Sequence, residues 1–157
     1  MSLVVYRDGV LYADTRAWGG DSNVPSPGAK DKVLRADDGS LIGITTAVVG
    51  CARDILAAYN AGKTFVDGGN FRALVVKPGV PGYFYWDDDC HLSGPFLEPH
   101  FAVGTGAKYA LGALEAGASM PEVYRTAAKY DYFTDSTYRI FQVDPPLPAP
   151  KARRKRT

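Results

Sequence analysis

Short apolar runs separated by turn-forming residues fill most of the chain. Six of these runs form three pairs, and each pair brackets a turn sequence, which predicts three β-hairpins. The paired runs are 3–6 with 10–13, 33–36 with 41–45, and 71–77 with 83–86. The turn of the first pair is Asp8-Gly9, a two-residue sequence typical of tight hairpins.

Three other segments carry apolar residues at helical spacing. They are about 47–59, about 107–115 and about 120–130, and Ser119 with Glu122 forms a capping-box sequence ahead of the last helix. Two more short strands are predicted at 101–103 and 138–143. Strands, a helix, strands, two helices and a strand predict an α+β protein whose helices cover the outer faces of two sheets. The pattern alone leaves other α+β layerings open.

Composition places the chain among globular proteins. Its 157 residues are 46% hydrophobic and 22% charged, which is typical of one soluble domain. No apolar run approaches about eighteen residues and no basic-then-apolar leader is present, so we expect neither a membrane span nor a secretory signal. Cys51 and Cys90 do not suggest a disulfide framework or a zinc site. We therefore expect a cytoplasmic protein.

Positive charge is concentrated at the C-terminal end. Five lysines and arginines lie within residues 151–157, and removing them from the formal net charge of +1 leaves −4 for the rest of the chain. Residues 144–150 are rich in proline. These features predict a folded domain over 1–143, followed by a proline-rich linker and a basic flexible tail over 144–157. Contact of the tail with nucleic acid or an acidic partner, and a merely solubilising role, both remain open.

Ser2 is a candidate nucleophile. Its small side chain allows removal of Met1, and the new N-terminus would then carry a hydroxyl and an α-amine on one residue. The amine has an ordinary pKa of about 7.7–8.0, against about 10.4 for a lysine side chain, so a neutral fraction is available as a base. No histidine is required for this chemistry.

Four blocks of sequence carry a resemblance: 7–17, 30–34, 101–112 and 127–134. The first contains Gly9-Val10-Leu11-Tyr12-Ala13-Asp14-Thr15-Arg16 and is similar to the pattern G-V-hydrophobic-A-D-S/T-R, and the second begins with Lys30-Asp31-Lys32-Val33. The third places Gly104-Thr105-Gly106 between a strand and a helix, and the fourth ends in Asp131-Tyr132-Phe133-Thr134. In this order they resemble segments of proteasome β-subunits and of bacterial proteasome-like peptidases. The resemblance spans about residues 2–143 and is strongest to short, stand-alone proteasome-like proteins of phage and bacterial genomes.

The resemblance implies a fold and an activity. The fold is the four-layer α-β-β-α sandwich of the N-terminal nucleophile hydrolases. The activity is cleavage of peptide bonds by the processed Ser2, with its own α-amine as the base and no cofactor. It further implies peptides or unfolded proteins as substrates, a ring-shaped homo-oligomer, and an unfolding ATPase as a candidate partner.

The resemblance also assigns roles to individual residues. Lys32 matches the lysine that lowers the pKa of the terminal amine and hydroxyl, and Asp14 matches its aspartate partner. The backbone N–H of Thr46 matches the oxyanion donor. Asp131, Thr134 and the proton-relaying Thr105 match polar residues near the terminal residue, whereas Arg16 matches an arginine with a structural role. The candidate catalytic set is Ser2, Asp14, Lys32, Thr46, Thr105, Asp131 and Thr134.

Two positions depart from the family pattern. The nucleophile is most often threonine in the family, and the oxyanion turn has glycine where this chain has Thr45-Thr46-Ala47. The added Cβ of Thr46 can crowd the scissile carbonyl or alter the turn. The alternative functions are therefore an inactive proteasome-like assembly or binding protein, such as a phage structural or accessory component, and a hydrolase of small amides.

Two other sequences resemble ligand sites without matching them. Gly104-Thr105-Gly106 is too short for a nucleotide-binding fingerprint and lacks the lysine that follows in a phosphate-binding loop. Residues 87–91, Asp-Asp-Asp-Cys-His, are consecutive, and consecutive side chains rarely converge on one ion. We interpret them as an acidic turn.

Overall fold

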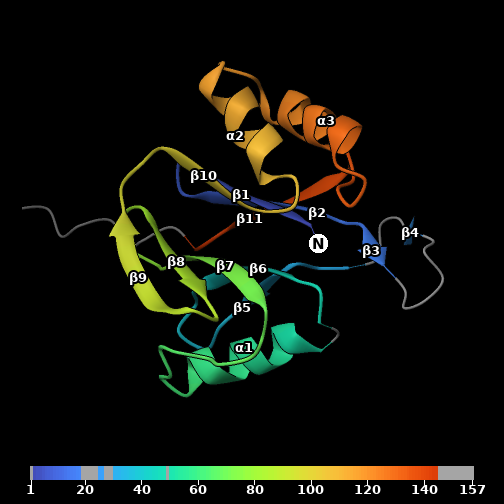
Figure 1. Cartoon of the computed structure of the whole chain (residues 1–157). Coiled ribbons are helices and arrows are strands. Elements are labelled where there is room, and N and C mark those ends of the chain that lie inside the picture. The colour runs from blue at the N-terminus through green and yellow to red at the C-terminus, as the bar shows by residue number, and fades with distance from the viewer. Residues whose placement is uncertain (1, 19–24, 27–29, 49, 145–157) are drawn as a thin grey trace, which may run out of the picture.

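Two antiparallel sheets lie face to face in the computed structural model, which describes residues 2–18, 25–26, 30–48 and 50–144 (Figure 1). The four-stranded sheet has the order β10 (His100–Gly104), β1 (Leu3–Arg7), β2 (Val10–Asp14), β11 (Tyr138–Gln142). The five-stranded sheet has the order β5 (Val33–Arg35), β6 (Leu41–Thr46), β7 (Phe71–Val76), β8 (Tyr83–Asp87), β9 (Cys90–Phe96). A short ribbon pairs β3 (Ala17–Trp18) with β4 (Pro25–Ser26).

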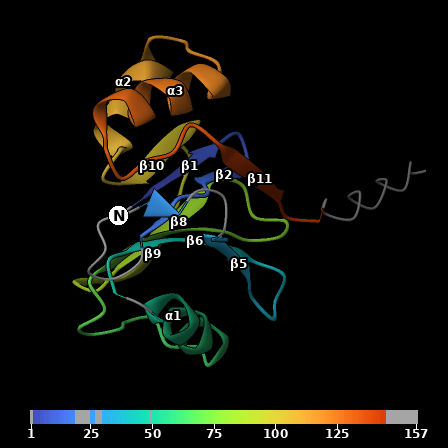
Figure 2. The same cartoon turned by 90° about the vertical axis from the view of Figure 1, so that its right-hand side faces the viewer.

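Helices form the two outer layers. α2 (Ala107–Glu115) and α3 (Met120–Tyr130) cover the four-stranded sheet, and α1 (Cys51–Asn60) covers the five-stranded sheet (Figures 1 and 2). This arrangement confirms the predicted α+β class and the α-β-β-α layering. Within the described residues, no helix combines the length and the hydrophobicity that a membrane crossing requires.

The central strand β1 carries apolar side chains on both faces, so both faces of its sheet must be buried. Leu3 and Val5 pack into the cluster beneath α2 and α3, whereas Val4 and Tyr6 pack between the two sheets. The chain reverses after β1 through Asp8 (φ 49°) and Gly9 (φ 86°), the backbone conformation that a two-residue hairpin requires. The predicted first hairpin is therefore confirmed, and its first strand is buried on both faces.

The aromatic residues of β8 also pack on both faces of their sheet. Tyr83 and Tyr85 face the other sheet, whereas Phe84 and Trp86 pack toward α1. The next residues form the predicted acidic turn, in which Asp87 accepts hydrogen bonds from the Tyr85 hydroxyl (2.7 Å) and from the Asp89 backbone N–H (2.9 Å). Both oxygens of the Asp87 carboxylate thus accept hydrogen bonds from within this segment.

Two sequence predictions need correction. The first helix begins at Cys51 rather than near residue 47, because Gly50 adopts a left-handed conformation (φ 83°) immediately before it. Strand β9 was not expected, because residues 90–96 mix polar and apolar residues and include Gly94-Pro95, and the strand is a largely exposed edge. The predicted linker and tail, apart from Asp144, lie outside the described residues.

Close approach of the two sheets generates a prediction at Gly43. A Cβ at this position would lie 2.5 Å from Cγ1 of the fully buried Val4, so we expect Gly43→Ala to lower the free energy of unfolding by about 1–3 kcal/mol. Gly112→Ala is the matched control, because nothing lies within 4 Å of its added Cβ in α2. Urea unfolding monitored by circular dichroism measures both variants, and equal stability losses would contradict tight sheet packing at Gly43.

Candidate active site

A buried ion pair lies at the end of the sandwich where β1 begins. Nζ of Lys32 lies 2.6 Å from Oδ1 of Asp14, and the two residues are only 4% and 1% exposed. Asp14 ends β2, and Lys32 immediately precedes β5, so the pair joins the two sheets. Sequence alone places these residues 18 positions apart, and the fold brings them into direct contact.

Three donors converge on the Asp14 carboxylate. Oδ1 also accepts the backbone N–H of Leu3 at 2.9 Å, and Oδ2 accepts the backbone N–H of Asp135 at 3.1 Å. Leu3 directly follows Ser2, which is itself buried. The carboxylate therefore holds the first residues of β1, Lys32 and the segment after α3 in one arrangement.

Burial governs the charge on Lys32. Desolvation lowers the pKa of its amine from the ordinary value of 10.5, and the charge and hydrogen bond of Asp14 oppose this effect. The lysine thus loses its proton at a lower pH than a surface lysine does. In its charged form, it would lower the pKa of a free amine or hydroxyl beside it.

A second polar cluster surrounds Asp131, at the C-terminal end of α3. Its Oδ2 accepts hydrogen bonds from the hydroxyls of Thr105 (2.7 Å) and Thr134 (2.5 Å). The space around the cluster is tight, because a Cβ on Gly106 would lie 2.6 Å from Oγ1 of Thr134. The carboxylate thus fixes the orientation of two hydroxyls from separate segments of the chain.

Gly104 brings this second cluster to the N-terminal strand. It pairs with Leu3 across the β1–β10 ladder, and an added Cβ would lie 1.9 Å from the backbone oxygen of Ser2. Its φ of 109° is also a conformation that favours glycine. Thr105 follows directly, so the end of β10 lies against Ser2 with the Asp131 cluster beside it.

The Thr46 turn is held by its own side chain. The Thr46 hydroxyl donates to the backbone oxygen of Asn70 at 3.2 Å and accepts the Val48 N–H at 3.0 Å. Thr46 does not have a positive φ, so this turn does not depend on glycine at this position. A pocket of about 260 Å³ lies between Thr46 and Thr105, with Arg72 on its wall. The predicted oxyanion donor and the predicted proton relay thus border one space.

The structure brings together the seven residues predicted from the sequence. Asp135, which is not among these seven residues, connects the two polar clusters: it follows Thr134, and its backbone N–H donates to Asp14. Its carboxylate lies 3.8 Å from the Arg16 guanidinium, which also donates to the Tyr132 oxygen at 2.8 Å. No side-chain motif identifies Asp135, because its contact with Asp14 is made by the backbone. Arg16 stabilises the same loop, as expected for a structural residue.

Comparison with known proteins identifies the fold. No protein-family model and no curated protein sequence matches the chain. Thiobacillus denitrificans BPH matches with a TM-score of 0.65 and 18% identity, over 92% of this chain and 100% of that chain. Eukaryotic HslV from Trypanosoma brucei matches with a TM-score of 0.64 and 16% identity, over 89% and 97%. T. denitrificans BPH in complex with epoxomicin matches with a TM-score of 0.60 and 20% identity, over 92% and 99%. The chain therefore has the proteasome-like N-terminal nucleophile hydrolase fold.

The buried ion pair predicts a large stability effect at Asp14. We expect Asp14→Asn to lower the free energy of unfolding by about 3–5 kcal/mol, because the charged Lys32 would lose its partner in the interior. Asp31→Asn is the matched control, since the Asp31–Arg139 pair is about half exposed on both sides and should contribute less than about 1 kcal/mol. Chemical denaturation of both variants measures the difference.

The same variant should respond to pH in a defined direction. Loss of Asp14 removes the main effect that raises the pKa of Lys32, so the folded state of Asp14→Asn should favour the neutral amine still more strongly. A folded-state pKa below the unfolded value makes stability increase as pH rises toward 10.5. The stability deficit of Asp14→Asn should therefore shrink between neutral and alkaline pH. A deficit that is constant with pH would contradict a charged Lys32 as its cause.

Proposed function

We propose that this protein is an N-terminal nucleophile hydrolase that cleaves peptide bonds with Ser2 after removal of Met1, a residue that lies outside the described part of the chain. The observation that carries the proposal is the Asp14 carboxylate, which binds both Lys32 and the backbone N–H of the residue after Ser2. This contact holds a buried lysine beside the N-terminal strand. A structural core would gain little from a buried lysine at this place, because burial opposes its charge.

In the proposed reaction, the Ser2 hydroxyl oxygen attacks the substrate carbonyl carbon and its proton passes to the Ser2 α-amine. The Thr46 backbone N–H donates a hydrogen bond to the carbonyl oxygen and stabilises the negative charge that develops there. The ammonium group then protonates the leaving nitrogen as the C–N bond breaks, which leaves an ester on Ser2. Water attacks this ester and gives its proton to the same amine. The bond between the carbonyl carbon and the Ser2 oxygen then breaks, the ammonium group returns the proton to that oxygen, and the acid is released.

The remaining residues support these proton transfers. The positive charge of Lys32 lowers the pKa of the Ser2 amine and hydroxyl, and Asp14 positions that charge. Asp131 orients the Thr105 and Thr134 hydroxyls, and Thr105 relays protons near the amine. The structural similarity to a BPH that is in complex with epoxomicin supports the proposal, because epoxomicin is a peptide epoxyketone and thus a peptide-like ligand.

Assembly is part of the proposal. We expect a ring-shaped homo-oligomer in the cytoplasm, with an unfolding ATPase as a candidate partner and a tail at 144–157 outside the folded domain. The exposed aromatic residues Tyr109, Tyr130 and Tyr132, on and just after the outer helices, support an association surface, since Tyr109 and Tyr130 stack on each other at 5.6 Å in an exposed position.

Intact-mass spectrometry with epoxomicin tests the chemistry. The purified protein should lack Met1 and gain the mass of one inhibitor molecule, and Ser2→Ala should gain none. Lys32→Met should slow adduct formation by at least about 10²-fold, whereas Lys30→Met, at an exposed lysine two residues away, should not. A retained Met1 would reject the mechanism and favour an inactive assembly or binding protein.

Light scattering tests the assembly. We expect one discrete molar mass that is a multiple of 16.9 kDa and is unchanged over a tenfold dilution. A mass near that of one chain at every concentration would contradict the ring.

A further inference from the structure

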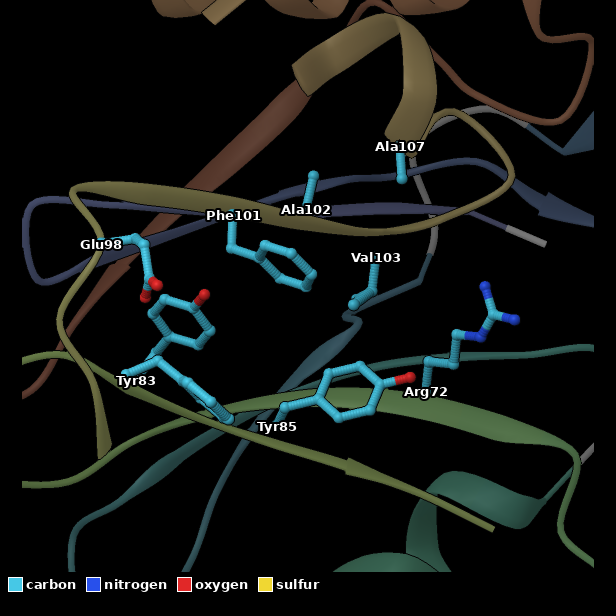
Figure 3. A pocket seen from close by; sticks show the side chains of 9 residues that line it. Arg72, Tyr83, Tyr85, Glu98, Phe101, Ala102, Val103 and Ala107 are labelled. Atoms are coloured by element: carbon cyan, nitrogen blue, oxygen red, sulfur yellow. The ribbon is translucent and has the colours of Figure 1, made fainter. Parts of the chain in front are cut away.

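A second cavity opens along the edge of the sandwich, beside the candidate active site. It has a volume of about 400 Å³, within the usual range of about 300–1,000 Å³ for ligand pockets. Figure 3 shows its walls: Phe101 and Val103 come from β10, and Tyr83 and Tyr85 come from the facing sheet. β10 and β9 are the edge strands of their sheets, so the cavity opens at the side of the molecule. We name this cavity the aromatic cleft.

The aromatic cleft and the candidate active site share one wall residue, Arg72. This residue lines both the cleft and the pocket that contains Thr46 and Thr105. Arg72 is also the cross-strand neighbour of Thr45, directly before the Thr46 turn. A chain bound at the turn can therefore extend past Arg72 into the cleft. Phe101 lies three residues before Gly104, the last residue of β10, which corresponds to about 10 Å, and Thr105 follows Gly104 directly.

The walls of the aromatic cleft are apolar in the middle and polar at both ends. Phe101 stacks on Tyr83 with ring centroids 5.4 Å apart and meets Tyr85 edge-on at 6.3 Å. Glu98 closes the far end, where it is hydrogen bonded to the Tyr83 hydroxyl; burial, aided by Glu98, raises the pKa of that hydroxyl to about 12. Arg72 stands at the end nearest the active site (Figure 3). The cleft thus offers ring faces beside one positive charge.

Arg72 is free to bind an anion. Its side chain is exposed, and among the described residues its guanidinium forms no ion pair and no hydrogen bond. Asp87 is its cross-strand neighbour, but the Asp87 carboxylate instead accepts the Tyr85 hydroxyl and the Asp89 backbone N–H. A guanidinium with five available donors favours a carboxylate, which it can bind through two oxygens.

The spacing of these groups defines the ligand. Arg72 on β7 pairs with Asp87 on β8, and Asp87 lies two residues from Tyr85. Two positions along a strand correspond to about 7 Å, which is therefore the offset between Arg72 and Tyr85 along the strand direction. Side chains two positions apart on an extended peptide point the same way and are separated by the same distance. On the basis of the proposed function, we propose that the aromatic cleft selects peptide substrates that carry an aromatic side chain and a carboxylate two positions apart. The ring lies against Phe101 and Tyr85, and the carboxylate binds Arg72.

Peptide binding to Ser2→Ala tests the proposal without cleavage. Fluorescence anisotropy would compare labelled hexapeptides with phenylalanine and aspartate two positions apart, in each order, against a peptide of the same composition with the two residues adjacent. At least one of the spaced peptides should bind at least tenfold more tightly than the adjacent one, because adjacent side chains on an extended chain point to opposite sides. Equal affinities of all three peptides would overturn the proposal.

Variants of the aromatic cleft give a second test. Arg72→Glu should reverse the charge preference, so that a peptide with lysine in place of aspartate binds better, and Phe101→Ala should remove the preference for phenylalanine. Arg125→Glu and Phe65→Ala are matched controls, because both residues are exposed and lie outside the cleft. If Phe101→Ala fails to fold, Arg72→Glu still tests the proposal, because Arg72 is exposed and its substitution should not disturb the core. The same response to Arg125→Glu would indicate bulk charge and overturn the proposal.

The two proposals fail separately. If Ser2 forms the epoxomicin adduct but the spaced peptides have no advantage, the aromatic cleft is rejected and the hydrolase stands. If no adduct forms but the spaced peptides bind through Arg72, the peptide-binding cleft stands and the cleavage chemistry is rejected.

Discussion

The Asp14 carboxylate is the contact on which the candidate site depends. It binds Lys32 from the opposite sheet, the backbone of Leu3 at the start of β1 and the backbone of Asp135 after α3. Burying a carboxylate and an ammonium group costs several kcal/mol per ion, and their attraction offsets this only when the other hydrogen-bonding positions are also occupied. Here the backbone N–H groups of Leu3 and Asp135 occupy the other hydrogen-bonding positions of the carboxylate. The arrangement is therefore best understood as a device for positioning the N-terminal strand, with stability as a lesser result.

Two glycines allow the close approaches on which this geometry depends, one between the two sheets and one between neighbouring strands of a sheet. Gly43 leaves room for Val4 between the sheets, and Gly104 leaves room for the backbone of Ser2 at the end of β10. Gly104 then directs the chain to Thr105 and the Asp131 cluster. Backbone approach, rather than a side-chain contact, thus sets the distance between the N-terminal residue and the second polar cluster.

Much of this fold follows from local sequence. Asp8-Gly9 predicts the first hairpin, and the capping box of Ser119 and Glu122 correctly marks the start of α3. Strand β9 could not be predicted in the same way, since an exposed edge strand lacks the apolar alternation of a buried one. Ser2 is a candidate from its position and chemistry, whereas the resemblance supplies the other six candidate catalytic residues. Asp135 and Arg72 were missed, because one contributes its backbone and the other becomes informative only when two strands place it beside a cavity.

Thr46 shows why a departure from a family pattern needs the structure to interpret it. Glycine in a turn is required when the backbone adopts a positive φ or when another group leaves no room for a Cβ. At Thr46 the φ is not positive, and the hydroxyl is hydrogen bonded to the backbone of Asn70 and Val48. The side chain is thus held against the loop before β7 and braces the turn whose N–H is the proposed oxyanion donor. Where the family pattern has glycine, this chain therefore has a turn that does not need a positive φ and is held by side-chain hydrogen bonds.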